Sequence, residues 1–353
     1  MASILKSKLK ENKKLLYIKN CISGYSRTSS YEAIPNQELR SKYLFFTLNR
    51  EPQNDIVVYK IDIKGGRTGF FAIYRQILQM LYICDKLKYM PYITVTDSSY
   101  NNNDSDNAYE NIFLQPNGIS LQDLQGAAVI IEGTREHIIN VENMTDNKEE
   151  LIGGYEVKQE LIEILAKIEE KYIRIRPDIE QQIEKEISDL IGSKKTIAIH
   201  YRGNAFNVGF SGHPIPLKPE DYYSYIDECI KNGYNQIFVA TDDQHFLNAL
   251  TDRYKGIVKF YSDTYRSSNG IDVHEQENLR ENNGFLLAYE VMRDMLTLAY
   301  CDCLICGNSQ VTIAARIHKC ALSKKYEYIK IIDKGVFKKS DYKSIKKYWS
   351  ISK

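Results

Sequence analysis

The apolar positions of this chain follow two alternating periods. Short runs of β-branched and aromatic residues, such as residues 56–63 (IVVYKIDI), are typical of buried strands. Between such runs lie segments in which apolar residues recur every three or four positions, as in residues 70–87, and this period predicts amphipathic helices. Strands that alternate with helices of this length indicate an α/β fold built on parallel sheets.

The first half of the chain contains one strand–loop–helix–strand unit. The strand at residues 56–63 runs into a loop at 64–69 with Gly65, Gly66 and Gly69, and the helix at 70–87 follows. Glycine-rich loops in this position let the backbone approach a nucleotide closely. Further strands are expected at 92–95 and 127–131, and charged helices at 155–175 and 177–191.

The second half repeats the alternation more regularly. Strands are expected at 195–201, 236–240, 258–261, 303–306 and 328–332, and helices at 219–232, 243–254, 284–300 and 310–321. We therefore predict two Rossmann-type domains, residues 1–190 and residues 191–353. A ligand is expected in the cleft between the domains, at the carboxyl ends of their strands.

Polar residues follow three of the predicted strands in the second half. Arg202 comes directly after the strand at 195–201, and Asp242 and Asp243 follow the strand at 236–240. Asn308, Ser309 and Gln310 stand at the start of the helix at 310–321. A fixed arginine beside a helix N-terminus is typical of a diphosphate site, because the guanidinium and the free backbone N–H groups both favour an anion.

Asp294 lies on the apolar face of a predicted helix. It shares this face with Leu287, Val291 and Leu298, at spacings of four, three and four residues. A carboxylate on such a face is costly unless a donor satisfies it. A structural ion pair with Arg293 or Arg316 would satisfy it, and so would the two adjacent N–H donors of a guanine ring.

The segment from Thr196 to Ile317, about a third of the chain, resembles the donor-binding domain of GDP-fucose-dependent transferases. This group includes the α1,6-fucosyltransferases, the rhizobial nodulation fucosyltransferases and the protein O-fucosyltransferases. The matching motifs occur in the family's order: His200-Tyr201-Arg202, Ala240-Thr241-Asp242-Asp243, Asp294 with Asp302, and Ser309-Gln310-Val311. The first half resembles the family less, through the glycine-rich loop and residues 107–113.

The resemblance implies a GT-B-like fold and a role for each matching residue. His200 and Asp294 would contact guanine, and Arg202 and Ser309 would hold the β-phosphate. Asp242 would support the nucleotide or order the loop of Arg202. The implied reaction is inverting transfer of fucose from GDP-fucose to a glycan hydroxyl, with no metal and no cofactor besides the sugar nucleotide.

The catalytic base is not assigned by the resemblance. The family has an acidic residue where this chain has Ala205, after Gly203 and Asn204. His213 is one candidate, since a neutral imidazole accepts a hydroxyl proton near neutral pH, although it would equally serve to order the loop. Glu220, Asp221 and Glu110 are the other candidates.

Three further groups have a simple structural interpretation beside a functional one. Asp104 and Asp106 have the spacing of a metal-binding pair but lie in an Asn-rich loop. Cys301, Cys303 and Cys306 surround a predicted buried strand, where structural thiols are favoured over a metal cluster. His274 lies in a loop that either closes over the cleft to contact the acceptor or is only solvated.

Composition narrows the class of protein. The 47 basic residues nearly balance the 46 acidic ones, so the overall charge does not indicate a nucleic-acid partner. Seven cysteines do not suggest a disulfide framework, and no apolar run reaches the roughly 20 residues of a membrane span. We therefore expect a cytoplasmic protein, whose basic ends are either solvated or attracted to anionic lipid.

The expected partners are a nucleotide sugar and a glycan or lipid-linked glycan acceptor, as in polysaccharide biosynthesis. Two other functions stay open at this point. One keeps the chemistry with another GDP- or UDP-sugar, and the other is a non-catalytic module that binds a nucleotide or a glycan.

Overall fold

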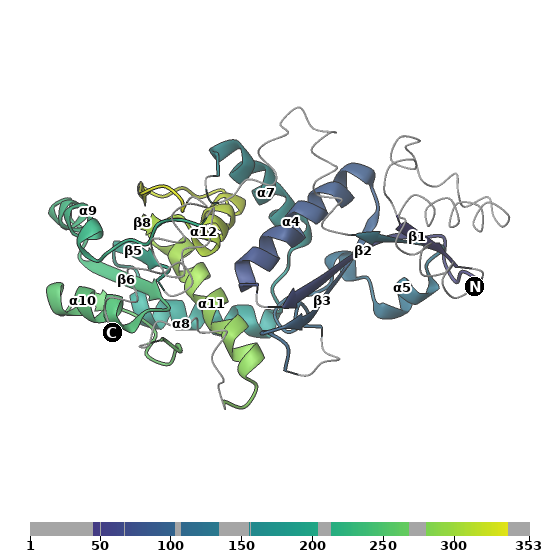
Figure 1. Ribbon diagram of the computed structural model, residues 1–353, viewed down its shortest axis with the longest axis horizontal. Helices are drawn as coiled ribbons and strands as arrows, with labels where there is room; N and C mark the ends of the chain where they lie inside the picture. The colour runs from purple at the N-terminus through teal and green to yellow at the C-terminus, as the bar shows by residue number, and fades with distance from the viewer. Residues whose placement is uncertain are drawn as a thin grey trace.

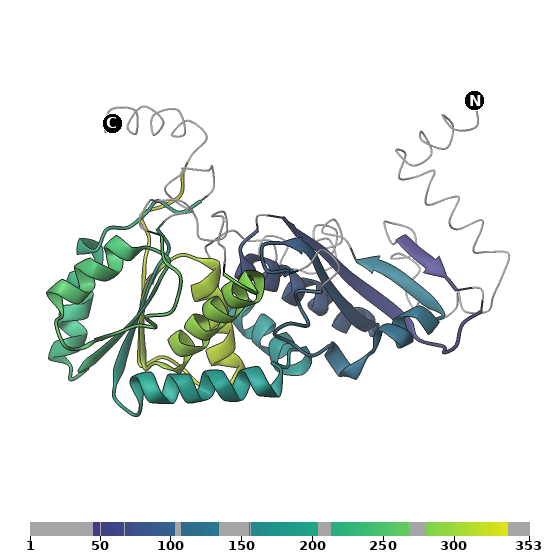
Figure 2. The same ribbon diagram turned by 90° about the horizontal axis from the view of Figure 1, so that it is seen from below.

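The computed structural model describes residues 45–49, 51–66, 68–102, 107–133, 155, 157–203, 213–267 and 280–337. Within these ranges the chain forms one four-stranded and one five-stranded sheet. The two sheets lie toward opposite ends of an elongated molecule, with helices between them (Figures 1 and 2). The expected α/β class with two sheets is confirmed.

The second sheet has the strand order of a Rossmann fold. Its strands are β5 (Thr196–Tyr201), β6 (Gln236–Thr241), β7 (Val258–Lys259), β8 (Cys303–Gly307) and β9 (Tyr328–Ile332). All pairs are parallel, in the order β7-β6-β5-β8-β9. The order reverses between β5 and β8, so the carboxyl ends of these two strands form the switch point where open α/β sheets bind ligands.

The helices of this half cover both faces of the sheet. They are α9 (Glu220–Lys231), α10 (Gln244–Arg253), α11 (Asn283–Tyr300) and α12 (Gln310–Ala321). Every residue of β5 and β6 is buried, which explains why these strands consist largely of apolar residues without polar alternation.

The first sheet is mixed, with the order β1-β4-β2-β3. Strands β2 (Val57–Gly66), β3 (Met90–Ser98) and β4 (Val129–Gly133) are parallel, as predicted. Strand β1 (Phe45–Leu48) pairs antiparallel with β4 at the edge, which the sequence pattern did not indicate. Helix α4 (Phe70–Leu87) has its predicted bounds, and two short helices, η2 (Pro116–Gly118) and α5 (Leu121–Gly126), precede β4.

The expectation of a loop at residues 64–69 is partly wrong, because β2 continues through Gly66. Gly65 and Gly66 extend the pairing with β3, and Gly66 lies opposite Ser98. A Cβ atom on Gly65 would lie 2.3 Å from Cβ of Ser98, so a larger residue does not fit there. Gly66 has a φ of +52°, which favours glycine and begins the turn into α4.

Helices between the two sheets join them into one core. Helix α7 (Gln159–Tyr172) packs against α4 and α12, while α8 (Pro177–Ile191) packs against α11. Buried apolar residues of α4, α7, α11 and α12 belong to a single cluster. At its centre the Glu169 carboxylate accepts a hydrogen bond from the Tyr74 hydroxyl, at 2.7 Å, and contacts Nδ1 of His318 at 2.6 Å. Helix α4 is therefore held firmly against α12.

None of the helices in the described ranges is long and apolar enough to cross a membrane.

Candidate functional site

The carboxyl ends of β5 and β8 open into two adjoining hollows. The first, here the Asp294 hollow, spans about 620 Å³ including the solvent at its mouth, and Asp242, Glu290 and Asp294 contribute to its wall. The second, the Ser309 hollow, spans about 330 Å³, and Asn308 and Ser309 line it. His200, Tyr201 and Arg202 line both hollows, so the end of β5 is the wall between them.

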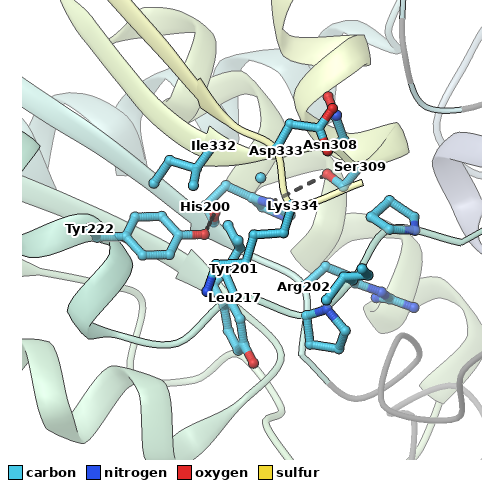
Figure 3. Close-up of a pocket in the computed structure, with 14 residues that line it drawn as sticks. His200, Tyr201, Arg202, Leu217, Tyr222, Asn308, Ser309, Ile332, Asp333 and Lys334 are labelled. Carbon is cyan, nitrogen blue, oxygen red and sulfur yellow. Dashed lines mark hydrogen bonds between the residues drawn. The ribbon is translucent and has the colours of Figure 1, made fainter. Parts of the chain in front are cut away.

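His200 is buried at the end of β5 and joins this strand to the start of α12. Its Nδ1 lies 3.4 Å from Oγ of Ser309, and its carbonyl oxygen accepts a hydrogen bond of 3.0 Å from the Tyr222 hydroxyl (Figure 3). Burial and the nearby charge of Arg202 lower the pKa of His200 to about 3. The imidazole is therefore neutral at physiological pH and does not add to the positive charge of the site.

Arg202 follows β5 and is oriented by the end of β6. Its Nη1 lies 3.1 Å from Oδ2 of Asp242, while Oδ1 of Asp242 accepts a 3.1 Å hydrogen bond from the backbone N–H of Gly203. The guanidinium points away from the His200 ring (Figure 3). A Cβ on Gly203 would lie 2.6 Å from the Tyr201 ring and 2.9 Å from Oδ2 of Asp243, so only glycine allows this turn.

Asp294 is the most unusual group in the site. Its side chain is buried in α11, and Oδ1 has no hydrogen-bond partner in the described part of the chain. Burial raises the pKa of this carboxyl to about 7, against the opposing charges of Arg266 and Arg293. A buried carboxylate oxygen without a donor destabilises the protein unless a ligand supplies the donor.

The structural partners considered for Asp294 are engaged elsewhere. Arg293 pairs with Glu186 at 2.6 Å and with Asp263 at 2.8 Å. Arg316 donates to the carbonyl oxygen of Val157 at 3.4 Å. The described part of the chain contains no direct ion pair between Asp294 and either arginine, although the charge of Arg293 acts on the Asp294 carboxyl.

The start of α12 presents a capped helix end to the Ser309 hollow. The Oγ of Ser309 accepts from the backbone N–H of Thr312, and the Thr312 hydroxyl accepts from that of Ser309, at 3.2 Å each. Asn308 lines the hollow beside it. Gln310 turns toward the first half of the chain, where its Oε1 accepts from Nη1 of Arg75 at 3.4 Å.

Several residues expected in the site have structural roles outside the two hollows. Asp243 caps α10 by accepting the backbone N–H of Phe246 at 2.8 Å. Asp302 accepts the N–H of Thr196 at 2.9 Å, at the opposite end of the sheet from the two hollows. Gly65, Gly66 and Gly69 lie at the end of β2 and the start of α4 and do not line either hollow. Tyr100 connects this region to the site. It lines the Asp294 hollow, and its hydroxyl accepts the N–H of Phe70, the residue after Gly69, at 2.7 Å.

Among the described candidate bases, His213 is the one on which the charge of Arg202 acts, although it does not line either hollow. The charge of Arg202 acts with burial to lower the pKa of His213, and its ring contacts the Tyr155 ring edge-on at 5.6 Å. The backbone of His213 is fixed by the C-terminal segment, since its carbonyl accepts the N–H of Phe337 at 2.9 Å. A largely neutral imidazole in this position can take a proton from a hydroxyl.

The other candidate bases are less suited by position. The carboxylate of Asp221 pairs with Lys334 at 2.6 Å, and Glu220 is exposed in the first turn of α9. Glu110 belongs to the first half and accepts a hydrogen bond of 2.7 Å from Gln115. Asn204, Ala205, His274, Asp104 and Asp106 lie outside the described residues.

Four cysteines in the second half are buried within the packing, and Cys320 is partly buried. Cys301, Cys303 and Cys306 are fully enclosed free thiols, and Sγ of Cys303 lies 3.6 Å from that of Cys229. In the described ranges no group of three His, Cys, Asp or Glu side chains is arranged to hold a metal ion.

Sequence reasoning missed Glu290 and Tyr100, which line the Asp294 hollow, and Arg75, which contacts Gln310. Glu290, one turn before Asp294 on α11, lines the Asp294 hollow and pairs with Arg280. Arg75, in the middle of the apolar stretch of α4, is buried against Gln310. Arg75 could have been found by the same reasoning as Asp294. Each is a charged residue at a buried position of a largely apolar helix.

No protein-family model matches the sequence, and no curated protein matches it either. Solved structures with a similar arrangement include NodZ α-1,6-fucosyltransferase co-crystallised with GDP, with 14% identity and a TM-score of 0.49 over 75% of this chain and 92% of that one. NodZ from Bradyrhizobium is 16% identical, with a TM-score of 0.46 over 75% and 93% of the two chains. POFUT1 in complex with GDP-fucose is 12% identical, with a TM-score of 0.45 over 79% and 98%.

Proposed function

We propose that this chain is a glycosyltransferase that uses a guanosine diphosphate sugar, with GDP-fucose as the donor. The observation that carries the proposal is Asp294, which lines a hollow shared with Arg202 and whose buried Oδ1 lacks a donor in the described part of the chain. The Asp294 carboxylate, which would bind the nucleobase, and the Arg202 guanidinium, which would bind the phosphates, line the same hollow.

Guanine is the nucleobase that suits a lone buried carboxylate. Its N1–H and exocyclic amino group are adjacent donors, which match the two oxygens of Asp294. Uracil offers one N–H between two carbonyl oxygens, and adenine offers an amino group beside an acceptor nitrogen, so each would bring a lone pair against the carboxylate. Hydrogen bonds to a charged group contribute about 1.5–3 kcal/mol, enough to select the base.

The diphosphate would bind at the end of β5. The forked guanidinium of Arg202 can hold two phosphate oxygens, and the start of α12 at Asn308 and Ser309 adds the partial positive charge of a helix N-terminus. Asp242 orients Arg202 before any ligand binds. Little free energy is therefore needed to hold the guanidinium in place when the diphosphate binds.

The fucosyl group, the inversion and the independence of metal are proposed from the motif resemblance. In this reaction an acceptor hydroxyl attacks C1 of the sugar as the bond from C1 to the β-phosphate oxygen breaks, and GDP leaves with the bonding electrons. Arg202 would stabilise the charge that develops on GDP, and neutral His213 would take the hydroxyl proton.

The acceptor belongs to this proposal as a glycan or lipid-linked glycan of a surface polysaccharide. The enzyme would act in the cytoplasm, with its basic ends near an anionic membrane. These features are supported by composition and by the basic character of both ends of the sequence.

Release of GDP from GDP-fucose tests the proposed enzyme. The wild type should hydrolyse the donor slowly without an acceptor, and Arg202→Ala should reduce the rate by about a hundredfold or more. Arg253→Ala, which removes an exposed cation from α10, is the matched control and should leave the rate unchanged. Equal rates in wild type and Arg202→Ala would contradict the role of Arg202, and binding without any turnover would favour a non-catalytic module.

A further inference from the structure

A second cation approaches the donor site from the first half of the chain. Arg75, on α4, is only 6% exposed, and its Nη1 donates to Oε1 of Gln310 at 3.4 Å. Gln310 is the first residue of α12 and follows Ser309, which lines the Ser309 hollow. The guanidinium of Arg75 thus lies against the same helix start that forms part of the proposed diphosphate site.

Arg75 and Arg202 act on a common neighbour. Burial raises the pKa of the Tyr155 hydroxyl, and the charges of Arg202 and Arg75 both oppose this rise. The charges of two guanidinium groups, one from each half of the molecule, therefore act on the same hydroxyl. Burial also lowers the pKa of Arg75 to about 10, the direction expected of a cation in a medium of low dielectric.

The described cations that line the two hollows, Arg202 and Lys334, are each offset by a carboxylate. Asp242, 3.1 Å from Arg202, offsets its charge, and Lys334 at the Ser309 hollow is offset by Asp221 at 2.6 Å. His200 is neutral, because its pKa is lowered to about 3. A sugar-linked diphosphate carries about two negative charges, which the partial charge of one helix N-terminus, about half a unit, does not balance.

Arg75 is held in position before a ligand binds. Its neighbour Tyr74 donates to Glu169 at 2.7 Å, and Glu169 contacts His318 of α12 at 2.6 Å. Helices α4 and α12 are thereby fixed to each other, and the guanidinium does not have to be carried to the site by a domain movement.

We propose that Arg75 is a positioning residue for the diphosphate, acting from the first half through Gln310 and through its charge. The proposal rests on the proposed function, since it assumes that a nucleoside diphosphate binds at the ends of β5 and β8. It implies that the site distinguishes a diphosphate from a monophosphate by a residue outside the nucleotide-binding half.

The test compares the affinities of GDP and GMP, measured by calorimetry, in the full chain. Arg75→Gln removes the charge and keeps a shorter polar side chain with an amide donor. It should weaken GDP binding by about tenfold or more and GMP binding much less, and Arg75→Lys should recover most of the loss. Lys86→Gln, which removes an exposed cation from the same helix, is the control and should change neither affinity.

The outcomes separate this inference from the proposed function. Suppose that wild type binds GDP. If Arg75→Gln then binds GDP and GMP as tightly as wild type, or loses affinity for both equally, the role of Arg75 is refuted while the proposed function stands. If wild type binds neither nucleotide, the proposed function fails and the inference fails with it. If Arg75→Gln does not fold, the same comparison with Gln310→Ala decides, and an unchanged GDP to GMP ratio in that variant overturns the proposal.

Discussion

The Asp242 carboxylate makes two contacts with the turn after β5: Oδ2 lies 3.1 Å from Nη1 of Arg202, and Oδ1 accepts the N–H of Gly203 at 3.1 Å. One side chain at the end of β6 thus fixes both the guanidinium and the backbone that carries it. This contact ties the orientation of Arg202 to the neighbouring strand.

Asp242→Ala is expected to lower donor turnover by about tenfold or more, because Arg202 loses the group that orients it. The adjacent Asp243→Ala is a matched control. Asp243 caps α10, so its loss should cost about 1 kcal/mol of folding free energy and leave turnover per folded molecule unchanged. Steady-state kinetics and urea denaturation of both variants measure these effects, and a greater loss of turnover in Asp243→Ala would argue against the assignment.

Asp294→Asn is expected to become more stable relative to wild type as the pH rises from 5 to 8. Burial raises the pKa of Asp294 to about 7, above its ordinary value of about 4 in an unfolded chain. The folded protein therefore binds this proton more tightly, and its stability falls as the pH rises through that interval. The amide side chain of the variant does not ionise, so the difference should change by at most about 3 kcal/mol between these two pH values.

Urea denaturation at the two pH values measures this difference. The exposed Asp252→Asn serves as a control and should show no comparable trend. A stability difference for Asp294→Asn that does not depend on pH would mean that the carboxyl is solvated or has a donor in the folded protein.

Glu169→Gln is expected to destabilise the protein by about 1–3 kcal/mol, because the buried charge that bonds Tyr74 and His318 is lost. The adjacent and exposed Glu170→Gln should cost less than about 0.5 kcal/mol. Chemical denaturation compares the two, and equal stability would show that the three side chains do not tie α4 to α12.

Much of the fold was predictable from the period of apolar residues. Helices α4, α8 and α12 and strand β9 have the predicted bounds, since each combines a clear period with a glycine, proline or charged residue at its ends. The start of α7 was placed four residues early, and Lys158 stands at its N-cap without a capping side chain. Strand β1 was missed, because four residues at a sheet edge carry no periodic signal of their own.

The site was predictable where it depends on strand order. Arg202, Asp242 and Ser309 were placed together because the carboxyl ends of parallel strands meet at one edge of a sheet, while Asp294, on α11, was placed there by the motif resemblance. The partners of these residues were not predictable. Arg75 and Tyr100 reach the site from the first half through tertiary packing that no local pattern encodes.

Calorimetric titration of the wild type with GDP, IDP and UDP at pH 8 tests the central claim most directly. Above its raised pKa of about 7, Asp294 is mostly ionised and accepts both donors of guanine. IDP lacks the exocyclic amino group and should bind about tenfold or more weakly than GDP, and UDP should bind more weakly still. Binding of UDP as tight as that of GDP, or equal affinities for GDP and IDP, would contradict a guanine-specific site at Asp294.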